Sequence, residues 1–306
     1  MDDAHLAALA AKAGLLAPRL DPVIPGVVSP VHRAVENACR MARDAAGGVV
    51  FLKTLHPDMT GFVDFKASEE ASRKAGEAGI APRLLLADGD SRTLVFEALD
   101  DAWRWGRIDD LRQPARFEAL VAAKKGFHAV PPLAPRPSLF DLLEDYRHRA
   151  RTIGLHGTAE ATLTAAEPVI GALRAAGADA VPCHADGASS NVMTGPGSAV
   201  RLVDFEWARQ SDPAHDLGTL LAELFPLDQE ANLAVAIWAG RLDGALLARA
   251  RLYGALDDLM WSLWGFLSAR ASARTHVEFT KYAEWRLMRA RNVLEGARLP
   301  GYLARV

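Results

Sequence analysis

Residues 183–206 form the most informative stretch of the chain and read CHADGASSNVMTGPGSAVRLVDFE. The first part contains an aspartate and an asparagine, Asp186 and Asn191, in the pattern H-x-D-x-x-x-x-N. The last part contains a second aspartate, Asp204, in the triplet D-F-E. Between them, the glycine- and proline-rich turn 195–197 separates two short runs that are suited to β-strands. This order predicts a polar loop and a hairpin that bring the three side chains around one point.

The three side chains are suited to phosphoryl transfer. That reaction needs one carboxylate near the attacking hydroxyl group, and oxygen ligands that hold Mg²⁺ against a triphosphate. We predict that Asp186 accepts the substrate proton and that Asn191 and Asp204 coordinate Mg²⁺. The alternative is a polar loop that matches the pattern by accident, which the complete spacing disfavours. No second histidine or cysteine lies at metal-ligand spacing from His184, so we expect this residue to support the loop through a hydrogen bond.

The first hundred residues alternate between segments typical of strands and of helices. The patterns predict strands over 49–53, 83–87 and 93–96, and helices over 3–14 and 64–78. From residue 114 onward helices dominate, and the predicted ranges are 114–130, 138–153, 159–176, 216–225, 229–238, 244–268 and 277–295. The sequence therefore predicts an α+β protein with a small sheet-rich lobe over residues 1–98 and a larger helical lobe over 99–306.

The composition narrows the possible partners and location. The 306 residues include 35 Lys and Arg against 38 Asp and Glu, which gives a formal charge of −3 and no basic footprint for nucleic acid. The two cysteines cannot form a disulfide framework, and the apolar stretches are shorter than the ~20 residues that span a bilayer. The N-terminus has no secretory signal pattern. We therefore expect a cytoplasmic protein that binds neither nucleic acid nor membrane, as a monomer or a homodimer.

Three segments resemble the aminoglycoside phosphotransferase and choline/ethanolamine kinase superfamily, and its choline-kinase branch in particular. They are Glu70 with the motif AGIAP at 78–82, His184 through Asn191 with DFEW at 204–207, and the motif WSLW at 261–264. Together they span roughly residues 30–290. The resemblance implies a protein-kinase-like bilobal fold with a small antiparallel-sheet lobe, and an ATP- and Mg²⁺-dependent transfer to a small alcohol.

The resemblance also implies roles in nucleotide binding. Lys53, at the end of a predicted strand, is expected to bind the phosphates and to pair with a glutamate of the following helix. We choose Glu70 for that pairing, and Glu69 stays an alternative. Glu97 and Leu99, at the junction of the lobes, are expected to contact adenine. The segment 28–37, which would cover the nucleotide, contains no glycine, so Ser29 and Asn37 are expected to do part of its work.

Other expected roles concern the catalytic loop and the substrate. Asp216 is expected to hold the backbone of the loop, and Glu223, on the same side of the predicted helix, to face the cleft. Trp261 and Trp264, three positions apart on a helix, are expected to line a pocket for a quaternary ammonium group with their aromatic faces. Tyr282 would add a third wall, and Glu206 and Glu223 would supply negative charge.

The reading favoured by these residues is a kinase for an amino alcohol such as choline or ethanolamine. An aminoglycoside or a thiamine-type alcohol on the same fold is the first alternative, because acidic residues are also numerous in the substrate region. A nucleotide-binding pseudokinase without turnover is the second, since the nucleotide segment lacks glycine. The retention of Lys53, Asp186, Asn191 and Asp204 argues against the second alternative.

Overall fold

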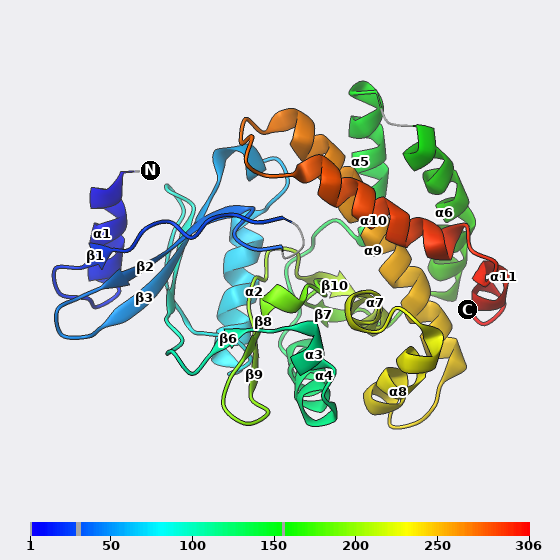
Figure 1. Ribbon diagram of the computed structural model, residues 1–306, viewed down its shortest axis with the longest axis horizontal. Coiled ribbons are helices and arrows are strands. Elements are labelled where there is room, and N and C mark those ends of the chain that lie inside the picture. The colour runs from blue at the N-terminus through cyan, green and yellow to red at the C-terminus, as the bar shows by residue number, and fades with distance from the viewer. Residues whose placement is uncertain (1, 29–31, 155–156) are drawn as a thin grey trace.

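The computed structural model describes residues 2–28, 32–154 and 157–306. Figure 1 shows two lobes. The lobe at the left of the view contains a twisted sheet with α1 and α2, and the lobe at the right is larger and mainly helical. The strands of the main sheet all come from the first hundred residues, and most of the helices come from the rest. This is the predicted α+β arrangement.

The N-terminal sheet has five antiparallel strands in the order β1-β2-β3-β5-β4. The predicted strands correspond to β3 (Val49–Leu55), β4 (Leu84–Asp88) and β5 (Thr93–Glu97). Two further strands were not predicted, β1 (Arg19–Leu20) and β2 (Asn37–Arg43). β2 was missed because its polar residues, Asn37, Arg40 and Arg43, lie three positions apart, so the segment shows neither the alternation of a half-buried strand nor the apolar run of a buried one.

Two helices cover this sheet. α1 (Asp3–Lys12) packs Leu6 and Leu9 against the sheet residues Val50, Leu52 and Val95. α2 (Phe65–Glu77) begins at Asp64, whose carboxylate accepts a hydrogen bond from the backbone of Ala67. It is followed by Gly79 at a φ of +71°, the left-handed conformation in which glycine commonly ends a helix. A short 3₁₀ turn, η1 (Pro57–Met59), links β3 to α2.

Short strands in the larger lobe frame the loop that the sequence singled out. β7 (Val181–Cys183) precedes the loop and pairs with β10 (Arg209–Ser211). The 3₁₀ turn η2 (Ser189–Asn191) ends the loop, and the predicted hairpin follows as β8 (Val192–Thr194) and β9 (Val200–Leu202). β6 (Arg104–Trp105) joins the edge of this hairpin, so the chain enters the larger lobe soon after β5.

The helical lobe is built around one long helix. α9 (Gly244–Ala271) has 28 residues and is buried along most of its length. Six helices pack against it: α5 (Leu139–Thr152), α6 (Gly157–Ala176), α7 (Pro213–Leu224), α8 (Asp228–Ala239), α10 (Phe279–Leu294) and α11 (Leu299–Leu303). Two others, α3 (Ile108–Leu111) and α4 (Pro114–His128), lie beside the hairpin and α7. The sequence placed α7 three residues too late, because Pro213 is well suited to the first turn of a helix.

Two glycines let α7 and α9 cross closely. A Cβ atom on Gly254 would lie 2.5 Å from the backbone oxygen of Gly218, and Gly218 likewise faces the backbone of α9. α9 therefore fixes the position of α7, the helix that carries Asp216. In the described part of the chain, no helix is both long and apolar enough to cross a membrane.

Candidate active site

The backbone of the predicted catalytic loop is held by Asp216, at the start of α7. Its Oδ2 accepts a hydrogen bond from the backbone of His184 at 3.1 Å, and its Oδ1 accepts one from Ala185 at 2.9 Å. Ala185 has a φ of +55°, a strained conformation for a residue with a side chain. The Asp216 carboxylate thus holds the loop in a turn that Ala185 does not favour by itself, as was predicted for Asp216.

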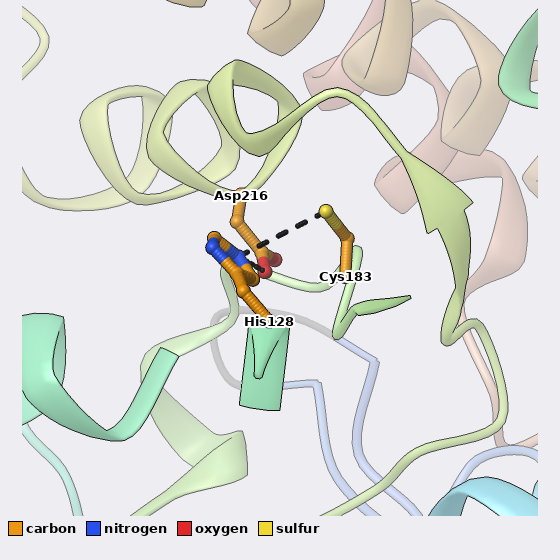
Figure 2. Close-up of side chains that lie close together, drawn as sticks. All are labelled: His128, Cys183 and Asp216. Carbon is orange, nitrogen blue, oxygen red and sulfur yellow. Dashed lines mark hydrogen bonds and ion pairs between the residues drawn. The ribbon is translucent and has the colours of Figure 1, made fainter. Parts of the chain in front are cut away.

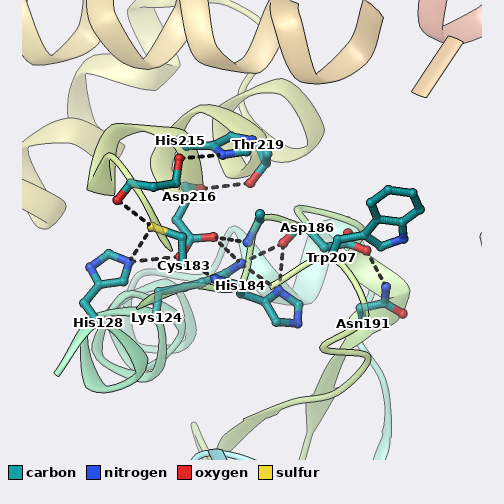
Figure 3. A network of polar contacts seen from close by, with 12 residues as sticks. Lys124, His128, Cys183, His184, Asp186, Asn191, Trp207, His215, Asp216 and Thr219 are labelled. Atoms are coloured by element: carbon teal, nitrogen blue, oxygen red, sulfur yellow. Dashed lines mark hydrogen bonds and ion pairs between the residues drawn. The ribbon is translucent and has the colours of Figure 1, made fainter. Parts of the chain in front are cut away.

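A buried lysine that the sequence analysis missed lies at the centre of this arrangement. Lys124 of α4 donates from Nζ to Asp216 Oδ1 at 3.1 Å, to the backbone oxygen of Asp186 at 2.7 Å and to His184 Nδ1 at 3.0 Å (Figure 3). Burial would raise the pKa of Asp216, but Lys124 and the hydrogen bond from His128 hold it well below its usual range. The Lys124–Asp216 pair therefore holds the loop at Asp186, the predicted catalytic carboxylate.

His184 supports the loop from inside, as predicted. Burial first and then the nearby charge of Lys124 lower the pKa of His184 to about 4, so the ring is neutral at physiological pH. With Nδ1 accepting from Lys124, Nε2 carries the hydrogen and donates to the backbone oxygen of Val203 at 2.9 Å. His184 therefore ties the loop to the strand end that leads into Asp204.

Asp216 also lies close to His128 and Cys183, and the three side chains together resemble a metal site. Their hydrogen bonds, however, are those of a structural support. Figure 2 shows His128, Cys183 and Asp216 close together, with His128 Nε2 at 2.9 Å from Asp216 Oδ2. Each Asp216 oxygen already accepts two hydrogen bonds. Burial first, and then the charge of Asp216, raise the pKa of the Cys183 thiol, which faces the backbone oxygens of Ser211 and Asp212. The arrangement leaves a cation no ionised thiolate and no unused carboxylate oxygen.

Asp186 and Asn191 are brought together, as the pattern predicted. Asn191 Nδ2 donates to Asp186 Oδ2 at 2.9 Å, and the backbone of Ala188 donates to Oδ1 at 2.7 Å. Burial, with a smaller contribution from the charge of Asp204, raises the pKa of Asp186 to about 6. A carboxylate with this pKa is a stronger base than an exposed one, and it is still ionised at neutral pH.

Asp204, the second aspartate of the pattern, forms an ion pair with Lys53. The distance from Lys53 Nζ to Asp204 Oδ1 is 2.6 Å, and Glu206 Oε1 is 2.8 Å from the same nitrogen. Asn37 of β2 donates to Glu206 Oε1 at 2.6 Å. Burial would raise the pKa of Asp204, but Lys53 lowers it, whereas burial and the charge of Asp204 raise the pKa of Glu206. Like Ala185, Asp204 adopts a left-handed backbone, at a φ of +69°.

These charged residues line a cavity of about 450 Å³ between the lobes. Its polar lining residues include Lys53, Asn191, Asp204 and Glu206, and its apolar ones include Ile24, Met41, Phe51, Leu94 and Phe96. Glu97 and Leu99 also line it, and their contact with adenine stays a prediction. The backbone N–H of Glu97 already donates to the backbone oxygen of Arg83, and its carboxylate binds Arg83 and Arg201.

The oxygen atoms of the polar lining residues fit a divalent cation. The cavity is lined by the carboxyl groups of Asp204 and Glu206 and by the amide of Asn191. Lys53, which also lines it, lies within ion-pair distance of both carboxyl groups. Glu206 Oε2 is buried and accepts no hydrogen bond from any residue that the structure describes. Carboxylate and amide oxygens are the ligands that Mg²⁺ prefers. Asp204 and Asn191 are therefore suited to hold such an ion.

The predicted ion pair between Lys53 and Glu70 is not formed, and this prediction is corrected. Glu70 Oε1 lies 2.7 Å from Lys74 Nζ, one turn along α2, and both Glu70 oxygens accept from the backbone of Ala134. The alternative, Glu69, pairs with Arg73 instead. Asp204 and Glu206 replace the predicted partner because they approach Lys53 from the other lobe, a contact with no local signal in the sequence.

Glu223 is also held in a way that the sequence did not predict. Its Oε1 accepts from the backbone and the hydroxyl of Ser189, at 3.1 and 2.9 Å, and its Oε2 lies 3.4 Å from Arg289. Glu223 therefore anchors the end of the catalytic loop, and it is already neutralised by an arginine. Its predicted role as a free negative charge for the substrate is corrected accordingly.

The three aromatic residues predicted for the substrate converge, and we call Trp261, Trp264 and Tyr282 the aromatic box. The ring centroids of Trp261 and Trp264 are 5.1 Å apart, and Tyr282 lies 6.1 and 5.9 Å from them. All three side chains are buried in the core between α9 and α10. Their contact with a substrate stays a prediction. The sequence analysis did not foresee that His32 also lies against all three rings.

The fold and the site together define a protein-kinase-like phosphotransferase, with a buried base beside a carboxylate-lined cavity between two lobes. The chain belongs to the phosphotransferase enzyme family, whose model matches residues 35–253. The sequence matches no curated protein. The resemblance stated from the sequence is thereby confirmed at the level of the family.

Solved structures confirm the predicted fold. A choline/ethanolamine kinase family protein from Mesorhizobium loti superposes with a TM-score of 0.80 at 22% identity, over 99% of this chain and 97% of that one. The choline kinase LicA from Streptococcus pneumoniae gives a TM-score of 0.75 at 15% identity, over 94% and 98%. A GDP complex of wild-type aminoglycoside 2′-phosphotransferase-IIIa gives 0.61 at 13% identity, over 95% and 99%. At these identities the likeness shows the fold alone.

Proposed function

We propose that this phosphotransferase moves the γ-phosphoryl group of ATP, with Mg²⁺, to the hydroxyl group of a cationic amino alcohol such as choline or ethanolamine. The position of Asp186 carries this proposal. The Asp186 carboxylate accepts a hydrogen bond from Asn191, which lines the nucleotide-sized cavity. The charge of Asp186 also acts on His32 and on Tyr282 at the aromatic box. We therefore expect an alcohol bound at the box to meet, at Asp186, a phosphate bound in the cavity.

The polar residues that line the cavity have separate roles in the proposed reaction. Lys53 is placed to bind phosphate oxygens, and Asn191 and Asp204 to hold the metal. When bound, Mg²⁺ neutralises charge on the triphosphate. Asp186 would accept the proton of the attacking hydroxyl, and Lys124 and Asp216 would keep that carboxylate in place. The AMP and GDP complexes known for similar structures support a nucleotide in this cavity.

The charges around the site favour an amino alcohol over a polycationic aminoglycoside. The acidic residues expected to attract a polycation are already paired: Glu206 with Lys53, Asp212 with Arg249, Asp216 with Lys124, and Glu223 with Arg289. A single cation on a small alcohol needs only aromatic faces and one carboxylate. The neutralised acidic residues therefore support the choline-like substrate class.

The test is ADP release with a panel of choline, ethanolamine, thiamine and kanamycin, each with Mg²⁺ and ATP. We expect turnover with choline or ethanolamine, and none without Mg²⁺. Turnover with kanamycin or thiamine alone would assign the alternative substrate class. ATP binding without turnover of any alcohol would leave a nucleotide-binding protein and contradict the proposal.

A further inference from the structure

The aromatic box already encloses a side chain of this protein that can carry a positive charge. The imidazole ring of His32 lies 5.4 Å from the ring of Trp261, 5.7 Å from Trp264 and 5.0 Å from Tyr282. Aromatic faces at such distances attract cations. His32 therefore occupies the place that the proposed function gives to the ammonium group of the substrate.

A carboxylate beside the box favours the charged form of His32. His32 Nε2 lies 3.0 Å from Glu36 Oε1 and 3.2 Å from Oε2, and both side chains are almost fully buried. Burial lowers the pKa of His32, but Glu36 outweighs it, so that the pKa is raised. Asp186 of the catalytic loop adds to this effect, and Arg286 of α10 opposes it. Glu36 therefore favours the imidazolium form of the ring that lies inside the box.

The hold on His32 is incomplete, unlike that on His184. His32 Nδ1 is buried, and it finds no hydrogen-bond partner among the described residues. A permanent structural histidine normally has both ring nitrogens satisfied, as His184 does through Lys124 and Val203. The backbone oxygen of His32 accepts a hydrogen bond from Ser190 of the catalytic loop, which brings the ring to the box. The imidazole is therefore the weakly held part of this contact.

We infer that His32 is an internal occupant of the cation site and decides which alcohols enter it. This inference rests on the proposed function. A substrate ammonium must displace the imidazolium, and Glu36 then pairs with the substrate instead. A neutral alcohol of the same shape would leave Glu36 buried without a counter-charge, which is strongly unfavourable. His32 and Glu36 together therefore admit cations and reject their neutral isosteres, at a cost in apparent affinity.

The experiment measures binding of tetramethylammonium to the full chain by isothermal titration calorimetry, without nucleotide. Replacing His32 empties the box and leaves Glu36 in need of a cation. We expect His32→Ala to bind tetramethylammonium at least tenfold more tightly than the wild type. The uncharged isostere of choline, 3,3-dimethyl-1-butanol, should gain less than threefold. His148→Ala, which removes an exposed histidine of α5, is the matched control and should bind both probes as the wild type does.

A second variant guards against a folding defect in the first. His32→Gln keeps a polar side chain of similar length but removes the charge, so it should also bind tetramethylammonium more tightly, by at least threefold. Circular dichroism melting checks that each variant is folded. Unchanged or weaker binding of the cation by folded variants would overturn the inference, and so would an equal gain for the neutral isostere.

The readout separates this inference from the proposed function. If the wild type phosphorylates choline but neither variant gains affinity for the cation, the role of His32 is wrong and the function stands. If the variants gain affinity and no alcohol is phosphorylated, the cation site stands and the function is wrong.

Discussion

At the scale of single residues, the raised pKa of Asp186 makes a testable statement about catalysis. Burial raises this pKa to about 6, and only the ionised carboxylate accepts the hydroxyl proton. Activity should therefore rise with pH through about 6 and reach a plateau above 7. His184 does not titrate in this window, because its pKa is lowered to about 4. We expect kcat for the amino alcohol to fall on the acid side of this pKa.

The variant Asp186→Asn tests the origin of that limb. It should lower kcat by roughly 10²- to 10⁴-fold, the usual contribution of a general base, and leave the affinity for ATP within about twofold. Isothermal titration with ATP and steady-state kinetics from pH 5 to 9 measure both quantities. A variant that retains the wild-type rate, or a wild-type profile that is flat from pH 5 to 8, would remove Asp186 from this role.

At the scale of secondary-structure elements, the crossing of α7 and α9 positions the loop through Asp216. Gly254→Ala places a Cβ atom 2.5 Å from the backbone oxygen of Gly218, and backbone atoms cannot rotate away. We expect a loss of about 2 kcal/mol of stability, or a fall in melting temperature of roughly 4–8 °C. Gly171→Ala on α6 is the control, because a Cβ atom there meets no neighbour and alanine favours the helix. Equal melting temperatures for the two variants would contradict a tight crossing.

The same scale explains what the sequence could predict. Asp186, Asn191 and Asp204 were brought together correctly because one loop and one hairpin connect them, so their spacing along the chain carries the geometry. Nothing in the sequence of α4 marks Lys124 as buried, and its partners come from the loop after β7 and from α7. One signal was present: Lys124 and His128 are four positions apart and share a helix face. Which loop that face would meet depends on tertiary packing, which no local pattern records.

At the scale of the whole molecule, the two lobes meet over buried charge. Lys53 of β3 approaches Asp204 and Glu206 of the larger lobe, at 2.6 and 2.8 Å. Asn37 of β2 adds a hydrogen bond to Glu206. The pKa of Lys53 is raised by these carboxylates despite its burial, so the lysine stays charged throughout the usual pH range. One ammonium group thus links a strand of the N-terminal sheet to the segment after β9 in the larger lobe.

The variant Lys53→Met should therefore destabilise the protein in a pH-dependent way. Without the ammonium group, Asp204 and Glu206 face one another in a buried site, so the pKa of Asp204 rises above its unfolded value and that of Glu206, already raised to about 8, rises further. A carboxyl whose folded pKa is raised costs stability as the pH increases through that pKa. The melting temperature should thus fall little below that of the wild type at pH 5, and by on the order of 5–10 °C at pH 8, where removing one partner of a buried pair costs about 3–5 kcal/mol.

Millimolar Mg²⁺ should restore part of the loss at pH 8, since the cation replaces the missing charge between the same oxygens. Differential scanning calorimetry at pH 5, 6.5 and 8, with and without MgCl₂, measures this, and Lys66→Met on the exposed face of α2 is the matched control. A deficit that is equal at all three pH values would mean that Lys53 contributes packing rather than charge to the contact between the lobes.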